Sequence, residues 1–363
     1  MKSFTVPLVV LSAVLLCCCA SFASAEPRLD PSSWTLQWQD EFEGSGLDRT
    51  LWDVEVNCWG GGNNEKQCYV DEEDNIFLEE GMLHLRSIRI PGGTTGDANN
   101  DCTLDPEPEP GVCTWTQPHT SGRIRTRNSD TGSFHHGYFE IRAQLPDGDF
   151  RWPAFWMLPT DTKYPGWAAS GEIDIMEYRS QLVDQMEFTL HHGAPWPDNQ
   201  HTGSGPVTLE GADFSADFHT FAILWIESEM RWFVDGVETY HLDLDRRWDI
   251  GVEDKSGYTA NGQPWDQDFH IILNMAIAGG FFGGSIADYN DDTAHLTWNN
   301  DFTIDYVRVY DVPEDWEEYY VEDLPGDGST DGSTDGSTDG SEDGDGESGN
   351  DGDAGHRPLP LFF

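Results

Sequence analysis

The stretch Gly171-Glu172-Ile173-Asp174-Ile175-Met176-Glu177-Tyr178 places acidic and aliphatic side chains in alternation. Successive side chains of a β-strand point to opposite faces, so Glu172 and Asp174 share one face and the isoleucines share the other. Glu177 follows Glu172 by five residues, and a regular strand would direct it into the core, where an unpaired carboxylate is costly. One extra residue at a β-bulge would return Glu177 to the face of the other two acids. The stretch therefore predicts a bulged strand with three carboxylates on one face.

Patterns typical of strands extend along most of the chain. Such runs cover residues 138–145, 186–191, 230–242, 269–276 and 302–310. Asp235-Gly236 supplies the positive φ angles of a two-residue hairpin turn. The sequence shows no long amphipathic helical pattern. Many strands in one domain of this length predict an all-β sandwich of two antiparallel sheets.

Tryptophan is concentrated just before the acidic strand. Trp152, Trp156 and Trp167 have flat faces that suit stacking on sugar rings, whereas Phe155 alternates away from them and is expected in the core. Retaining hydrolysis of a glycosidic bond needs two carboxyl groups roughly 5–5.5 Å apart, and a third carboxylate nearby raises the pKa of its neighbour. A surface strand of an acidic protein would also explain the acids alone. The tryptophans favour a site that cleaves carbohydrate.

Residues 1–25 have the organisation of a signal peptide. Lys2 precedes an apolar stretch over residues 6–16, and Ala23-Ser24-Ala25 offers small residues for cleavage. No later segment approaches the roughly 20 consecutive apolar residues of a membrane span. We expect the mature chain to be secreted and monomeric, without a membrane partner.

Four cysteines remain once the signal peptide is removed. An even number in an exported chain favours disulfides, and pairing of near neighbours is the simplest of three possible arrangements. We therefore predict that Cys58 pairs with Cys68 and that Cys102 pairs with Cys113. The first pair closes a loop over residues 57–67, and the second lies in a longer loop over residues 91–119 that is rich in Gly, Pro and Asn.

The charge of the chain limits its partners. A formal net charge of −48 argues against nucleic acid or an anionic membrane. It also disfavours polyanionic substrates, although a cleft can differ from the whole surface. Residues 325–363 carry an Asp-Gly-Ser-Thr repeat with nothing to bury, so we expect a disordered acidic tail after a folded domain over residues 26–324.

Over residues 34–312 the chain resembles the bacterial laminarinases of glycoside hydrolase family 16. The motifs that carry the resemblance are residues 38–42 (WQDEF), 59–65 (WGGGNNE), 120–126 (TSGRIRT), 137–142 (GYFEIR), 152–159 (WPAFWMLP), 172–177 (EIDIME), 272–276 (ILNMA) and 304–310 (IDYVRVY). The acidic triplet with its preceding tryptophans is the most specific of these motifs. The resemblance implies a β-jelly roll with a concave substrate cleft.

The resemblance also implies roles for individual residues. Glu172 matches the nucleophile, Asp174 its helper and Glu177 the general acid/base. His191 matches a histidine that lines the cleft, although it could also be a surface histidine on an alternating strand. The substrate-binding positions implied are Asn64, Glu65, Trp152, Trp156, Trp167, His191 and Asn274.

The resemblance implies structural calcium away from the cleft and no cofactor for catalysis. The matching positions are Glu41, the carbonyl of Gly81, and Asp305, which are oxygen donors of the kind that calcium prefers. Asp305 could equally be one more acid in an acidic protein. Two positions depart from the family pattern: Phe281-Phe282 stands where a tryptophan is frequent, and Ile88 stands where an arginine is usual.

These patterns predict a secreted, endo-acting retaining hydrolase of internal β-1,3-glucosidic bonds in laminarin-type glucans. Mixed-linkage β-glucan and agarose are alternative substrates. The Glu-x-Asp-x-x-Glu spacing fits laminarinase-like and agarase-like members, and residues 59–65 and 152–156 favour laminarin. A non-catalytic glucan-recognition protein is a further alternative, against which the retention of Glu172 and Glu177 argues.

Overall fold

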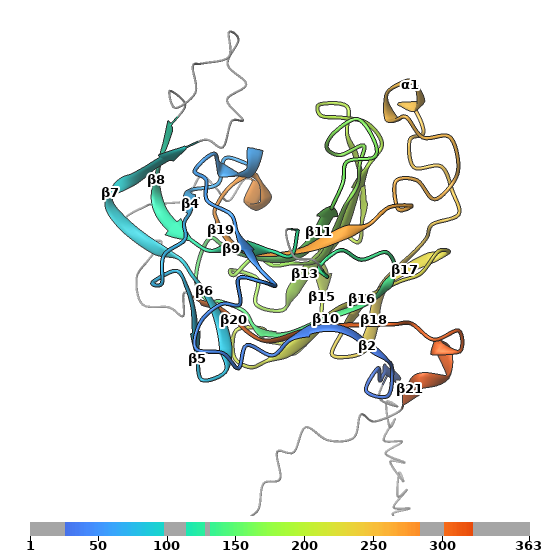
Figure 1. Cartoon of the computed structure of the whole chain (residues 1–363), viewed down its shortest axis with the longest axis horizontal. Coiled ribbons are helices and arrows are strands. Elements are labelled where there is room, and N and C mark those ends of the chain that lie inside the picture. The colour runs from blue at the N-terminus through green and yellow to red at the C-terminus, as the bar shows by residue number, and fades with distance from the viewer. Residues whose placement is uncertain (1–25, 98–113, 128–130, 284–300, 322–363) are drawn as a thin grey trace, which may run out of the picture. The chain divides into compact units, whose positions relative to one another are not determined.

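The computed structural model describes residues 26–97, 114–127, 131–283 and 301–321, which form a β-jelly-roll sandwich (Figure 1). The larger sheet has ten strands, in the order β21 (Tyr320–Val321), β1 (Arg28–Leu29), β18 (Val237–Asp243), β17 (Glu229–Val234), β16 (His219–Trp225), β10 (Gly137–Gln144), β20 (Asp301–Tyr310), β6 (Met82–Arg86) and β5 (Ile76–Glu79), with β2 (Leu36–Asp40) beside β20. The second sheet has eight strands, in the order β14 (Gln200–Gly203), β13 (Gln185–His192), β12 (Glu172–Glu177), β11 (Arg151–Pro159), β19 (Phe269–Ile277), β9 (Arg123–Arg125) and β3 (Asp53–Val54), with β15 (Val207–Thr208) beside β13. The all-β sandwich expected from the sequence is confirmed.

The described part of the chain also contains a small third sheet and four short helices. The sheet contains β4 (Gln67–Tyr69), β8 (Thr114–Ser121) and β7 (Ile88–Asp97), and β4 runs parallel to β8. The helices are η1 (Gly60–Gly62), α1 (Glu253–Ser256), a 3-10 turn over residues 280–283, and η3 (Trp316–Tyr319). Among the described residues, no helix has the length and apolar character needed to cross a membrane.

The core lies between the two large sheets, because each sheet turns one face inward. In β13 every second residue is buried, as the alternation of residues 186–191 predicts. Phe155 of β11 is fully buried, which confirms that it faces the core. Trp232 of β17 is also fully buried, and its Nε1 donates a hydrogen bond to the backbone oxygen of Asp174 at 3.0 Å. This bond ties the larger sheet to the acidic strand β12.

The predicted hairpin is confirmed in detail. Strands β17 and β18 pair from Val234 opposite Val237, and Asp235 and Gly236 have φ angles of 51° and 75°. Both values lie in the left-handed region that this turn requires.

The loops around the cysteines differ from expectation in one respect. Cys58 and Cys68 form a disulfide with an S–S distance of 2.04 Å, as predicted. The prediction of a long loop over residues 91–119 is wrong at both ends, because β7 extends to Asp97 and β8 begins at Thr114, and the two strands pair. Cys102 and Cys113 lie outside the described residues, as do the expected signal peptide over residues 1–25 and the expected acidic tail over residues 325–363.

Candidate active site

A β-bulge in β12 brings its three acids to one face. Asp174 lies opposite Thr189 of β13 and Glu177 lies opposite Glu187, so three steps along β12 match two along β13. On the other side, β12 shows a matching shift against β11. Ile175 is fully buried within this irregular stretch. The bulge predicted from the spacing of the acids is confirmed, and it keeps Glu177 out of the core.

Each of the two outer acids accepts a hydrogen bond from a tryptophan. Trp167 Nε1 donates to Glu172 Oε2 at 2.6 Å, and Trp152 Nε1 donates to Glu177 Oε1 at 3.1 Å. Trp167 comes from the connection between β11 and β12 and is 41% exposed, whereas Trp152 lies in β11, the strand beside β12. The indoles therefore fix both carboxylates while leaving the face of Trp167 open to a ligand.

His191 lies directly opposite Glu172 on β13. Its Nε2 is 3.3 Å from Asp174 Oδ2 and 3.7 Å from Glu172 Oε1. Burial alone would lower the pKa of His191, but the nearby Asp174, Glu172 and Glu177 outweigh it and raise the pKa to about 10. The imidazole is therefore a cation at neutral pH, and it partly balances the acidic cluster.

The same groups have the spacing of a metal site, since ligand atoms of Glu172, Asp174 and His191 lie within 4.8 Å of one another. A histidine binds a metal through a neutral nitrogen, whereas this imidazole is held in its charged form. A metal ion would therefore compete with a proton for this nitrogen.

The environment raises the pKa of both outer acids. Burial, followed by the charge of Asp174, raises the pKa of Glu172 to about 7, while His191 and the Trp167 N–H act in the opposite direction. Burial, again followed by Asp174, raises the pKa of Glu177 well above its ordinary value. One carboxylate that ionises near neutrality beside one that retains its proton is the pair that acid-assisted bond cleavage needs.

Trp156 and Asn274 belong to a hydrogen-bonded chain that runs under the site. Trp156 Nε1 donates to Asn274 Oδ1 at 2.6 Å, and Asn274 Nδ2 donates to the hydroxyl oxygen of Tyr69 at 3.0 Å. The Tyr69 hydroxyl donates in turn to Glu65 Oε2 at 3.4 Å, and Glu65 is only 5% exposed. The structure thus places Glu65 behind the site, where it supports Tyr69. Asn64, by contrast, lies exposed on the adjoining loop.

Several residues that adjoin the site were not predicted to belong to it. Arg123 of β9 lies over the ring of Trp156, 4.7 Å from its centroid. Phe281 stacks on Trp152 with centroids 4.5 Å apart. The Arg179 guanidinium lies over the Phe281 ring, 3.7 Å from its centroid, and Arg179 also forms an ion pair with Glu187. Two of them had a signal in the sequence: Arg123 stands within the motif over residues 120–126, and Phe281 stands where the family frequently has a tryptophan.

The comparisons with known proteins agree with this geometry. Residues 94–269 match the family described as Glycosyl hydrolases family 16. The chain is 41% identical over 315 residues to a glucan endo-1,3-beta-glucosidase of the springtail Cryptopygus antarcticus, a match covering 85% of this chain and 99% of that protein. It is 30% identical over 339 residues to a beta-1,3-glucan-binding protein of Penaeus monodon, covering 85% of this chain and 90% of that protein.

A solved structure gives the same result. The laminarinase from Rhodothermus marinus matches with a TM-score of 0.59 and 32% identity, over 76% of this chain and 97% of that chain. Because one relative is a springtail protein, the likeness extends beyond the bacterial laminarinases that the sequence resembles. On these likenesses and the acid-bearing strand, the chain belongs to glycosyl hydrolase family 16 and is a glycosidase.

Proposed function

We propose that this glycosidase cleaves internal β-1,3-glucosidic bonds of laminarin-type glucan with retention of configuration. The observation that carries the proposal is the bulge in β12, which sets Glu172 and Glu177 on one face with an indole N–H on each. The names of the relatives support the choice of substrate, since one is a glucan endo-1,3-beta-glucosidase and another a laminarinase.

The first step of the proposed reaction uses both acids. The Glu172 carboxylate attacks the anomeric carbon, and the bond from that carbon to the glycosidic oxygen breaks. Glu177 gives its proton to the departing oxygen, for which its raised pKa suits it. The product is a glycosyl ester on Glu172 together with the released part of the glucan.

The second step reverses the role of Glu177. A water molecule attacks the anomeric carbon, Glu177 takes a proton from it, and the bond to the Glu172 oxygen breaks. Asp174 and His191 act through Glu172: the charge of Asp174 raises its pKa and that of His191 lowers it, so together they set the pH at which the nucleophile forms.

The test compares reducing-end release from laminarin, lichenan, agarose and xylan side by side. Laminarin is expected to be cleaved fastest, with an early fall in viscosity and a ladder of oligosaccharides. Glucose as the sole early product would rule out endo action. Faster cleavage of lichenan or agarose would identify that polymer as the substrate in place of laminarin. Binding of laminarin without cleavage would show that the chain is a recognition protein.

We further propose that the chain is secreted and monomeric, and that it binds structural calcium. Along one edge of β20, β2 pairs with residues 307–310 and β6 with residues 301–304. Asp305 lies at the junction, where Glu41 follows β2 and Gly81 precedes β6. Their oxygens suit calcium in type.

Both calcium-site carboxylates have arginine partners in the structure. Glu41 accepts two hydrogen bonds from Arg308 at 2.8 Å, and Asp305 accepts one from Arg142 at 2.7 Å. Each of these oxygens keeps a lone pair for a metal ion. The positive charge of the guanidinium repels calcium, which makes Arg308 an electrostatic competitor of the ion.

A further inference from the structure

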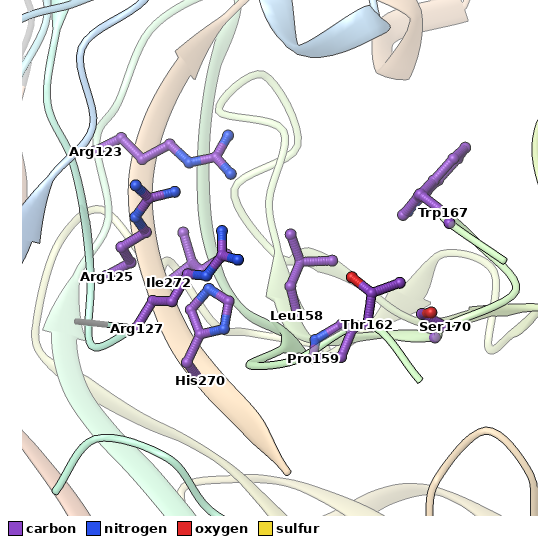
Figure 2. Close-up of a pocket in the computed structure, with 12 residues that line it drawn as sticks. Arg123, Arg125, Arg127, Leu158, Pro159, Thr162, Trp167, Ser170, His270 and Ile272 are labelled. Atoms are coloured by element: carbon purple, nitrogen blue, oxygen red, sulfur yellow. The ribbon is translucent and has the colours of Figure 1, made fainter. Parts of the chain in front are cut away.

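A hollow of about 160 Å³ opens beside the nucleophile, between the loop that carries Trp167 and strand β9 (Figure 2). Its lining includes Gly171, which precedes Glu172 in the chain, and Trp167, which donates a hydrogen bond to Glu172. The far wall holds three arginines, Arg123, Arg125 and Arg127. A ligand in this hollow would therefore lie next to the reacting sugar.

The three arginines share one side because of strand periodicity. Arg123 and Arg125 stand two residues apart on β9, opposite Asn274 and Ile272 of β19, and Arg127 follows at the same interval. Figure 2 shows their guanidinium groups gathered along the wall that faces Trp167. Three of the 15 arginines of the chain thus meet in one hollow of a protein whose net charge is −48.

Carboxylates neutralise two of these arginines but not the third. Arg125 bonds Asp53 and Glu55, at 2.9 and 3.0 Å, and Arg123 lies 3.2 Å from Glu55. Among the described residues no carboxylate pairs with Arg127. The hollow therefore offers one rigidly held pair of arginines and one cation without an acidic partner.

His270 adds an unused polar atom to the same wall. The side chain lines the hollow and is 2% exposed, and its Nδ1 has no hydrogen-bond partner among the described residues. Burial, followed by the three arginines, lowers the pKa of His270 to about 3, so the ring is neutral. A buried polar atom without a partner is unusual in native proteins and calls for a ligand or water. As the N–H tautomer, Nδ1 would donate to an anion.

We propose that this hollow binds an anionic substituent, a sulfate ester or a carboxylate, carried by the β-glucan chain close to the bond that is cleaved. The inference rests on the proposed function, which supplies the glucan. Arginine presents paired N–H donors that match the oxygens of both groups. The volume corresponds to about five water molecules, which is enough for such a group. The hollow is thus an exception to the acidic character of the chain as a whole.

The test measures kcat/KM on three substrates: laminarin, laminarin with sparse sulfate esters, and laminarin oxidised at C6 to carry carboxylates. The readout is the ratio of a charged to the neutral substrate, so general effects on catalysis cancel. Arg127→Gln is expected to lower this ratio about tenfold, which is the loss of one charge-assisted contact. The arm that shows the loss identifies the substituent.

Arg28→Gln is the matched control, because Arg28 lies on β1 of the larger sheet and bonds the Asp235 backbone oxygen. It removes the same charge and leaves the ratio unchanged. Inorganic sulfate, compared with chloride at equal ionic strength, should lower the ratio of the wild type and not that of Arg127→Gln. Equal ratios in wild type and Arg127→Gln for both charged substrates would overturn the inference.

The measurement on neutral laminarin distinguishes a failure of the proposed function from a failure of the anion site. If wild type does not cleave laminarin, the proposed function is wrong, and dissociation constants for the three polymers, from tryptophan fluorescence with Trp167 in the wall, then decide the inference. Tighter binding of a charged polymer that depends on Arg127 supports the anion site. Dissociation constants that do not depend on the charge of the polymer, or that are the same in wild type and Arg127→Gln, would contradict the anion site.

Discussion

The ring of Phe281 stacks on that of Trp152, with centroids 4.5 Å apart and planes inclined by 19°. Trp152 donates its indole N–H to Glu177, so the stack holds the donor that orients the proposed general acid. Arg179 secures the other side, because its Nε donates to the Phe281 backbone oxygen at 2.8 Å. Phenylalanine at this position therefore performs a defined packing role where the family frequently has tryptophan.

We predict that Phe281→Ala lowers kcat on laminarin by about two- to tenfold, the effect of losing an aromatic pair worth roughly 0.5–1.5 kcal/mol. Phe281→Trp, which keeps a flat ring, should retain most activity. An activated aryl glucoside needs little proton donation, so Phe281→Ala should affect it less than laminarin. An equal loss on both substrates would mean that Phe281 stabilises the fold without positioning Glu177.

The charges of Asp174 and His191 should move the acid limb of the pH–rate profile in opposite directions. His191 lowers the pKa of Glu172, so His191→Gln should raise it above about 7 and shift the limb to higher pH. Asp174 raises that pKa, so Asp174→Asn should shift the limb to lower pH. The measurement is kcat/KM between pH 4 and pH 9, roughly the range over which these groups titrate. Shifts of the same sign in both variants would contradict the assignment.

The bulge in β12 could be predicted from the sequence because it follows from a local rule. Glu172 and Glu177 differ by an odd number of positions, and burial of either charge is costly, so one residue had to be accommodated between them. The pairing of β7 with β8 could not be predicted in this way. Residues 91–97 have the Gly and Pro content of a loop, and their strand conformation depends on a partner distant in sequence.

The site was predictable where residues carry chemistry and not where they support it. Glu172 and Glu177 stand in a distinctive spacing, whereas Phe281 contacts Trp152 only after the chain has folded. Glu65 shows the opposite limit, since its motif predicts a substrate-binding side chain while the structure has this side chain buried and bound to Tyr69. Sequence spacing does not distinguish a residue that touches substrate from one that supports it.

Calcium is predicted to raise the melting temperature by mass action, by roughly 5–10 °C at about 100 times the dissociation constant. Asp305→Asn should abolish the increase. Arg308→Gln removes the competing partner of Glu41 and should lower the dissociation constant, measured by calorimetry. The site would be excluded if neither calcium nor a chelator changed the melting temperature of the wild type and if both variants behaved in the same way.

The proposed roles of the two glutamates give the last prediction, because the variant that lacks each glutamate should have a different catalytic defect. Glu172→Ala removes the nucleophile, so no glycosyl ester can form with any β-glucoside. Glu177→Ala keeps the nucleophile but lacks the proton that a poor leaving group needs. An aryl glucoside with an acidic phenol needs little protonation, so its first step should survive in Glu177→Ala.

The second step in Glu177→Ala then lacks a general base to activate water. Added azide needs no deprotonation, so it should restore turnover and give a β-glycosyl azide, because two inversions produce net retention. The product configuration is read by NMR, with wild type in azide as the control. In Glu172→Ala, azide attacks directly on the side opposite the leaving group, so a single inversion should give an α-glycosyl azide. The expected pair of products is therefore the α-azide from Glu172→Ala and the β-azide from Glu177→Ala. A β-azide from Glu172→Ala, or an α-azide from Glu177→Ala, would exchange the two roles.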